Sequence, residues 1–368
     1  MQYHLSTSFP KFFLLFLLTV GSLPFVASAK YRFDDFRAIP PIHEAKKQSM
    51  LTNTITPESV KNAYGLPKSG GNGTIAIIAA YDSPDILSDL NVFSKKYKLP
   101  LCESKDTCFE KKSFVVGSTA NSGWAMETAL DVEWAHAIAP DARILLVEAK
   151  TPSGANLLKA IDYARNRPDV VAISMSWGGK EFSDETTLDE HFISKYGATF
   201  FAASGDNGTG ASWPAASPNV ISVGGTHLAW DSNGKVVETA WSGSGGGASI
   251  FETEPSYQST YDIPRANGMR AIPDVAYNAD PSSGFPIYVN GEWHIVGGTS
   301  AGTPQWAAIR ALGNSMSGDI LYKDKSHDSS KYFRDITSGK NGSCTYYCNA
   351  RKHYDYVTGL GSPLTSEF

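Results

Sequence analysis

The sequence predicts a doubly wound α/β fold, in which helices cover both faces of a mostly parallel sheet. The main observation is a series of short, unbroken apolar runs bounded by turn residues. These runs lie at 74–80, 144–148, 170–175, 198–203 and 220–223. The segments between them are long enough for crossover helices. With 368 residues, of which 42% are hydrophobic and 19% charged, the chain can bury a large core.

Residues 1–29 are predicted to be a signal peptide. Lys11 precedes the apolar run 12–20, and Ala27-Ser28-Ala29 fits a small-residue cleavage site. An uncleaved membrane anchor is the alternative, but the run is shorter than the ~20 residues that a spanning helix needs. We therefore expect a secreted, extracellular protein that does not remain in a membrane.

Residues 30–50 are polar, mixed and proline-containing, which predicts a short extended lead-in. A segment of this length is too short for a folded prodomain. Regular structure is expected from Thr56-Pro57, which has the pattern of a helix start. Residues 51–368 are thus predicted to form the functional domain.

Charge and cysteine content restrict the partners. A net charge of −5 gives no basic patch for nucleic acid, and it leaves the oligomeric state open, with a monomer as the default expectation.

The four cysteines are expected to pair as Cys102 with Cys108 and Cys344 with Cys348, although crossed pairings stay possible. Zinc is a poorer explanation, since neither pair has the two-residue spacing of common zinc knuckles.

The most informative motif is 297–304, a glycine turn that brings Ser300 to the start of a predicted helix. Small neighbours let a substrate carbonyl approach the backbone, and an amide at a helix N-terminus can donate to an oxyanion. A serine cap on a glycine-rich turn would explain the same residues. A catalytic serine requires a base elsewhere in the chain.

Two carboxyl groups on one predicted helix could supply that base. Residues 124–138 have helical spacing, and Glu127 and Asp131 lie four residues apart on one face. Two carboxyl groups that share a proton are a familiar acid–base pair, whereas a solvated acidic face is the structural alternative. Asp206 adds a third carboxyl group, in a Gly-Asp turn at the end of an apolar strand.

An Asp-His-Ser triad is the competing arrangement. Asp82 follows the first apolar strand, where such a triad could place its aspartate. His136 lies more than two turns beyond Glu127, and no histidine motif opens a helix. Asp82 is therefore interpreted as a turn residue before Ser83-Pro84.

The order of these residues resembles the sedolisins, serine-carboxyl peptidases with a subtilisin-like fold. The likeness covers about residues 51 to 364. It is carried by Glu127-Thr-Ala-Leu-Asp131, Ala139-Pro140, Ser174-Met-Ser-Trp-Gly-Gly179, Ser204-Gly-Asp206, Ser222-Val-Gly-Gly-Thr226, Pro273-Asp-Val-Ala-Tyr-Asn278-Ala-Asp-Pro281 and Gly298-Thr-Ser-Ala301.

The resemblance implies that Ser300 is the nucleophile and Glu127 its general base. Asp131 would orient Glu127 and share its proton, and Asp206 would be the oxyanion-hole acid. Acid solution favours this set, because a carboxyl group with a pKa of about 4.3 still accepts a proton where a histidine of about 6.5 is charged. We expect an acidic optimum, with activity falling as Asp206 ionises.

The resemblance also implies a calcium site near the C-terminus. Its ligands would be the side chains of Asp335 and Asp355 and the carbonyl oxygens of Ile336, Arg351 and His353. The last two positions are typically glycine in sedolisins, which is a departure in this chain. A second departure is the short lead-in, because sedolisins are usually made with a long prosegment.

For the substrate cleft, Ser176, Gly178 and Gly179 are predicted to offer a strand edge to an extended peptide. A strand that ends in a Gly-Gly turn is the alternative. The leading functional prediction is a secreted acid-active endopeptidase that acts on proteins or peptides. A tripeptidyl-peptidase of the same family and a catalytically silent peptide-binding protein are the alternatives.

Overall fold

The computed structural model describes residues 1–2, 31–46, 55–103, 108–117, 121–313, 315–323 and 331–368. Residues 31–368 form one compact unit. The predicted signal peptide lies almost entirely outside the described residues. Among the helices of the described part, none is long and apolar enough to cross a membrane.

A mostly parallel sheet forms the centre of the unit, as predicted. Neighbouring strands in it are parallel, except that β10 runs antiparallel to β9 at one edge, while β13 pairs in parallel with β9. In spatial order the strands are β10 (Val236–Ala240), β9 (Val220–Trp230), β7 (Thr199–Ala203), β5 (Val170–Met175), β2 (Thr74–Ala80), β4 (Arg143–Ala149) and β3 (Phe109–Ser113), with β13 (Val275–Asn278) beside β9.

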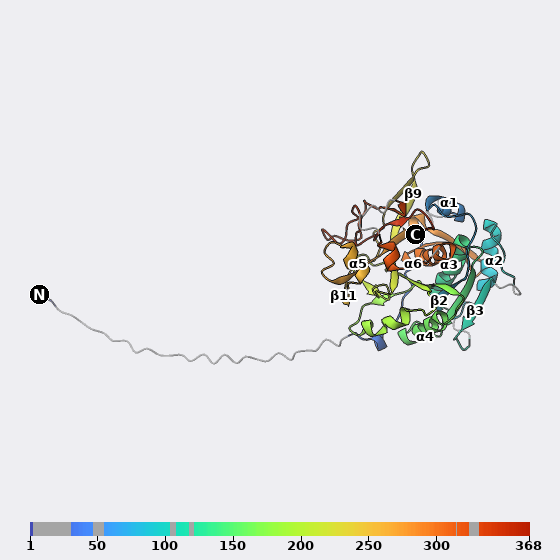
Figure 1. The fold of residues 1–368 in the computed structure, drawn as a ribbon, viewed down its shortest axis with the longest axis horizontal. Helices are drawn as coiled ribbons and strands as arrows, with labels where there is room; N and C mark the ends of the chain where they lie inside the picture. Colours follow the sequence, from blue (N-terminus) through green and yellow to red (C-terminus); the bar gives the residue numbers. More distant parts are fainter. Residues whose placement is uncertain (3–30, 47–54, 104–107, 118–120, 314, 324–330) are drawn as a thin grey trace. The chain divides into compact units, whose positions relative to one another are not determined.

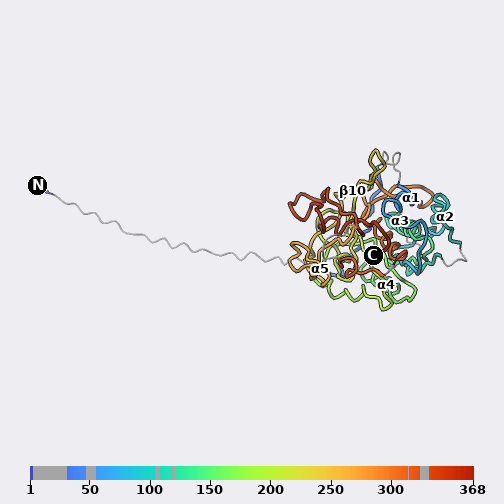
Figure 2. The backbone as a smooth tube through the Cα atoms, turned by 45° about the horizontal axis from the view of Figure 1, so that its top comes forward, coloured from blue at the N-terminus to red at the C-terminus, as the bar shows by residue number. Residues whose placement is uncertain are grey.

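Helices lie on both sides of this sheet. In Figure 1, α3 and α6 lie on one side of β2 and α4 lies on the other. The helices are α1 (Pro57–Ala63), α2 (Ile86–Tyr97), α3 (Ser122–Ile138), α4 (Gly154–Arg165), α5 (Ser256–Tyr261), α6 (Thr299–Leu312) and α7 (Gly318–Leu321). Figure 2 shows α1, α2 and α3 together at one end of the domain, with α5 at the opposite end. The doubly wound arrangement is therefore confirmed.

Smaller strand pairs lie outside the central sheet. A three-stranded antiparallel sheet joins a strand of the lead-in to the hairpin that precedes α6. Its members are β1 (His43–Glu44), β15 (Glu292–Gly297) and β14 (Phe285–Val289). The remaining pairs are β6 (Gly179–Lys180) with β8 (Ser212–Trp213), β11 (Gly247–Thr253) with β12 (Met269–Ile272), and β16 (Phe333–Arg334) with β17 (Ser362–Pro363).

Sequence accounts for the elements that position the site. Strands β2 and β5 coincide with predicted apolar runs, and every residue of β2 is buried. Helix α1 starts as predicted, with Thr56 Oγ1 accepting from the Ser59 amide at 3.1 Å. Both expected disulfides form, Cys102–Cys108 and Cys344–Cys348. The disulfide prediction is thus confirmed.

A buried ion pair links β12 to Asp274, the residue that precedes β13. The Arg270 guanidinium donates to both carboxylate oxygens of Asp274, at 2.8 and 2.6 Å, and both side chains are almost fully buried. Asp274 also accepts from the Ser222 amide of β9 at 2.7 Å. The pair therefore holds three strands together.

Removing one partner of this pair should destabilise the fold strongly. We expect Asp274→Ala to lower the free energy of unfolding by about 3–5 kcal/mol, because Arg270 would be left buried and unpaired. The control is Asp162→Ala, which breaks a more exposed pair with Arg165 and should cost under about 1 kcal/mol. Urea unfolding measures both changes, and equal losses would contradict the prediction.

Candidate active site

Ser300 lies in the first turn of α6, where the sequence predicts it. The residue is fully buried, and its hydroxyl donates to the carbonyl oxygen of Pro41 at 2.8 Å. Gly298 adopts a φ of 136°, and a Cβ at this position would come within 1.9 Å of the same oxygen. Glycine is therefore required for a carbonyl group to reach Ser300.

Helix α3 carries Glu127 and Asp131 one turn apart, both almost fully buried. This helix packs against α6, which brings the two carboxyl groups to Ser300. Burial raises the pKa of Glu127 well above its usual range, and the neighbouring Asp131 raises it further, whereas the Ser300 hydroxyl lowers it. Burial likewise raises the pKa of Asp131, whereas the hydrogen bond from Ser176 and the neighbouring Glu127 lower it.

Both raised pKa values have the same chemical consequence. Two carboxyl groups buried side by side cannot both ionise cheaply, so they retain at least one shared proton near neutral pH. Asp131 is fixed by the Ser176 hydroxyl, which donates to its Oδ1 at 2.6 Å. This hydrogen bond holds Asp131 in a fixed orientation one helical turn from Glu127.

The proton of the Ser300 hydroxyl is directed at Pro41, not at Glu127. Within the described residues, neither carboxyl oxygen of Glu127 has a hydrogen-bond partner within 3.5 Å, although its pKa responds to the Ser300 hydroxyl. Rotation of the hydroxyl away from Pro41 would free this proton. The arrangement allows proton transfer once the contact to Pro41 is released.

Asp206 approaches Ser300 from the end of β7. Its Oδ1 accepts from both the amide and the hydroxyl of Thr299, each at 2.8 Å. Burial raises the pKa of Asp206, while His43 and Thr299 lower it. The other oxygen, Oδ2, lies 2.6 Å from the position that a Cβ on Gly298 would take, so it faces the space that holds the Pro41 carbonyl group.

The lead-in runs through this site as an extended strand. Upstream of Pro41, Ile39 exchanges both backbone hydrogen bonds with Gly178, at 3.0 and 3.2 Å. Downstream, His43 and Glu44 pair antiparallel with Gly297 and Val296. The main chain is thus held on both sides of the carbonyl group that contacts Ser300, as a bound peptide substrate would be.

The predicted cleft residues divide into two kinds. Gly178 presents its backbone to the lead-in, and the Cα of Gly179 lies against a lead-in side chain, since a Cβ there would meet the Phe36 ring at 2.6 Å. Ser176 has a different position, because its hydroxyl contacts Asp131. Ser176 therefore supports the acid pair.

The residues of the competing triad are engaged elsewhere. Asp82 Oδ1 forms an ion pair with Lys111 at 2.7 Å, and the ring of His136 contacts the Pro100 carbonyl oxygen at 2.9 Å. His43 is the histidine that reaches the site, with its Nε2 3.0 Å from Asp206 Oδ2. It contacts the candidate oxyanion acid, not Ser300, so the arrangement differs from an Asp-His-Ser triad.

The predicted calcium ligands Asp335 and Asp355 lie on either side of one loop. The amide of His353 donates to Asp335 Oδ2 at 2.9 Å, and that of Arg351 donates to Asp355 Oδ2 at 3.0 Å. Within the described residues, no cluster of three or more acidic, histidine or cysteine side chains could hold a metal. Burial raises the pKa of both carboxyl groups. Carboxylate and carbonyl oxygens are the ligands that calcium prefers.

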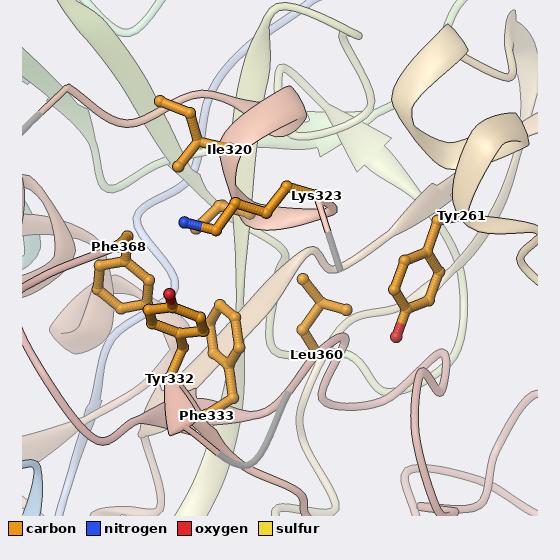
Figure 3. A pocket seen from close by; sticks show the side chains of 8 residues that line it. Tyr261, Ile320, Lys323, Tyr332, Phe333, Leu360 and Phe368 are labelled. Carbon is orange, nitrogen blue, oxygen red and sulfur yellow. The ribbon is translucent and has the colours of Figure 1, made fainter. Parts of the chain in front are cut away.

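A small apolar pocket lies apart from these residues (Figure 3). The rings of Tyr332, Phe333 and Phe368 stack near one another in its wall. Its complete lining is Tyr261, Ile320, Leu321, Lys323, Tyr332, Phe333, Leu360 and Phe368. None of the predicted catalytic residues lines this pocket, so it is not the site built around Ser300.

Sequence reasoning missed two features of the site. The contact of His43 with Asp206 depends on where the lead-in lies, and no local pattern marks it. The Pro40-Pro41 pair does favour an extended chain, but it does not indicate which surface that chain follows. The role of Thr299 in holding Asp206 follows from its place beside Ser300 at the start of α6.

Comparisons with known proteins show which family the chain resembles. Residues 113–321 match the model of the subtilase family, Peptidase S8. The chain is 32% identical to kumamolisin from Bacillus sp. (strain MN-32), over 87% of this chain and 64% of that protein. It is 28% identical to sedolisin from Pseudomonas sp. (strain 101), over 80% of this chain and 57% of that protein. The chain thus spans less than two thirds of these relatives.

The fold of the chain is also similar to that of a solved sedolisin structure. Pseudomonas sedolisin, a serine-carboxyl proteinase complexed with two molecules of pseudo-iodotyrostatin, superposes with a TM-score of 0.72 at 28% identity. The superposition covers 84% of this chain and 95% of that chain. Sphericase, at 19% identity and a TM-score of 0.52, shares the fold. The subtilisin-like fold is therefore confirmed.

Proposed function

The chain belongs to the subtilase family, within it to the sedolisins, and we propose that it is a secreted, acid-active serine-carboxyl endopeptidase. The observation that carries the proposal is the meeting of Ser300, Glu127, Asp131 and Asp206 around the carbonyl group of an extended peptide segment. Secretion rests on the sequence of residues 1–29.

The proposed reaction begins with attack of Ser300 Oγ on the scissile carbonyl carbon, as its proton passes to Glu127. The resulting oxyanion accepts a hydrogen bond from protonated Asp206. The C–N bond then breaks as Glu127 returns the proton to the leaving amine, which leaves an acyl group on Ser300. Water attacks this ester with Glu127 again as base, and the acid product and free Ser300 result.

The path of the lead-in supports cleavage within a chain. Residues 31–40 precede the carbonyl group at Ser300, and main-chain pairing continues upstream at Ile39. The cleft therefore accepts more than three residues on that side. A relative from Dictyostelium discoideum is named tripeptidyl-peptidase 1, at 26% identity over 85% of this chain and 58% of that protein. Removal of tripeptides is accordingly the second candidate, although the accessible length of cleft favours the first.

The lead-in must leave before a substrate can bind, since both use the carbonyl position at Ser300. Acid should favour this exchange. The His43–Asp206 contact is strongest when Asp206 is ionised, and protonation of Asp206 removes its charge. Because burial raises the pKa of Asp206, the contact weakens at a pH above the usual aspartate range. Assays should therefore follow an incubation in acid.

The test is cleavage of a quenched-fluorescence peptide library from strongly acid to neutral pH. The proposal expects cleavage in acid that depends on Ser300. Release of peptides only from free N-termini would favour the tripeptidyl-peptidase. Binding of peptides without turnover at any pH would favour a silent binding protein.

We also propose that Asp335 and Asp355 hold calcium, with the carbonyl oxygens of Ile336, Arg351 and His353 as further ligands. The ion would stabilise the loop, and no step of the reaction passes through it. Chelation with EDTA is expected to lower the melting temperature by roughly 5 °C, since a ligand that binds only the folded state stabilises it.

The control for this prediction is Asp335→Asn, which removes one ligand charge with little change in shape. Its melting temperature should respond to EDTA far less than that of the wild type, and magnesium should not restore the lost stability. An EDTA response that is zero in the wild type, or equal in the two proteins, would remove the calcium assignment.

A further inference from the structure

The lead-in buries the side chain of Phe36 in an aromatic pocket, beside a second lead-in ring, that of Phe33. Phe36 is fully buried, although most of its neighbours along the chain are exposed. Its ring lies edge-to-face with Trp213 at a centroid distance of 4.8 Å and beside Phe182 at 5.8 Å. Gly179 forms the third wall, where a Cβ would come within 2.6 Å of the Phe36 ring. The pocket therefore fits an aromatic ring closely.

Apart from Phe33 of the lead-in, whose ring lies 6.2 Å from that of Trp213, the walls of this pocket belong to the body of the domain. Trp213 lies on β8 and pairs through the backbone with Gly179 of β6. Its ring also packs against Trp177 at 6.2 Å and Phe192 at 5.8 Å. These contacts do not involve the lead-in, so the pocket should persist when the lead-in leaves, and an apolar surface would then be open to solvent.

Backbone contacts fix the distance between this pocket and Ser300. The amide of Gly154 lies 3.4 Å from the Phe36 carbonyl oxygen, and the amide of Ala38 donates to Pro152 at 2.8 Å. Ile39 then pairs with Gly178, and the carbonyl oxygen of Pro41 accepts from Ser300. An extended peptide between the same two edges would place the residue five positions before the attacked carbonyl in the pocket.

We propose that the Phe36 pocket is a substrate subsite that selects an aromatic side chain five residues before the residue whose carbonyl group Ser300 attacks. The inference rests on the proposed peptidase function, but it concerns binding and can be tested without turnover. Full burial of a phenylalanine side chain favours binding by about tenfold to a hundredfold over alanine.

The test uses the full chain with Phe36→Ala, which empties the pocket, combined with Ser300→Ala, which prevents cleavage. The probes are fluorescent peptides with the sequence of residues 34–46 that carry either phenylalanine or alanine at the position of Phe36. Fluorescence anisotropy should show about tenfold to a hundredfold tighter binding of the phenylalanine peptide. A third peptide, with alanine at that position and phenylalanine one position later, should show no such gain.

Gly179→Ala in the same background provides the matched pocket variant. Its added methyl group occupies the space of the ring, so the preference for phenylalanine should fall towards one. Circular dichroism checks that each variant folds. Should the Phe36→Ala chain fail to fold, Phe36→Leu leaves a smaller apolar group in the pocket and gives the same comparison with a reduced ratio.

Three results would overturn the subsite: equal binding of both peptides, no binding of either, or an unchanged preference in the Gly179→Ala variant. Failure of the proposed function gives a different result. In that case the phenylalanine peptide binds more tightly, yet the Phe36→Ala chain with Ser300 intact cleaves neither peptide at any pH.

Discussion

Replacing Ser300 with alanine is expected to lower the rate of peptide cleavage by on the order of 10⁴-fold or more. The hydroxyl is the group aimed at the carbonyl oxygen of the bound segment, from the first turn of α6. Glu127 and Asp206 would remain in place, but neither can form the acyl intermediate. Initial rates on a quenched-fluorescence peptide, after incubation in acid, measure the loss.

Stability and a matched serine variant separate this effect from misfolding. Alanine at this buried position removes one oxygen, so the melting temperature should stay close to that of the wild type. Ser259→Ala changes an exposed serine on α5 and should leave the rate unchanged. Equal cleavage by the Ser300→Ala and wild-type proteins would show that another group is the nucleophile.

The sequence was sufficient to predict the central strands, because burial on both faces leaves an unbroken apolar run. Strands β2 and β5 begin and end where those runs do. Strand β9 was predicted too short, at 220–223, and it extends to Trp230. Its second half pairs with β10 at the sheet edge and is only partly buried. Polar residues therefore interrupt the apolar run there, although the backbone hydrogen bonds to β10 continue.

The position of a candidate residue in the fold was predictable where that residue lies on a recognisable element. Glu127 and Asp131 share a helix face, and Ser300 starts a helix after a glycine turn. Contacts between distant segments were not predictable. The bond from Ser176 to Asp131 spans 45 positions, and that from Ser300 to Pro41 spans 259. Such contacts depend on packing, which local pattern does not encode.

Replacing Asp206 with asparagine is expected to change the pH dependence of cleavage more than its maximum rate. Asparagine keeps an oxygen that can accept from the Thr299 amide and hydroxyl. Its amide nitrogen can donate to the oxyanion at every pH, whereas aspartic acid donates only when protonated. In contrast, Asp206→Ala removes the donor and should lower kcat by about 10² to 10³-fold.

The direction of the shift follows from the pKa values. Burial raises the pKa of Asp206, so the acid form persists above the usual aspartate range, and wild-type activity should fall as the pH rises through that raised pKa. The asparagine variant should retain its activity at a higher pH. Profiles of kcat/KM against pH for the three proteins measure the difference. If the activity of the wild type and of Asp206→Asn fell over the same range of alkaline pH, the proposed role of Asp206 would be contradicted.

The rise of kcat/KM on the acid side of the same pH profiles, the acid limb, tests which of the carboxyl groups loses its proton there. Cleavage needs Glu127 ionised while Asp206 is protonated, and burial raises the pKa of both. The apparent pKa values therefore belong to the cluster and not to single residues. Removing the titration of Asp206 should leave the acid limb, which reports ionisation of the Glu127–Asp131 pair. Loss of both limbs in Asp206→Asn would mean that the three carboxyl groups titrate as one unit, so that Asp206 could not be assigned the alkaline limb alone.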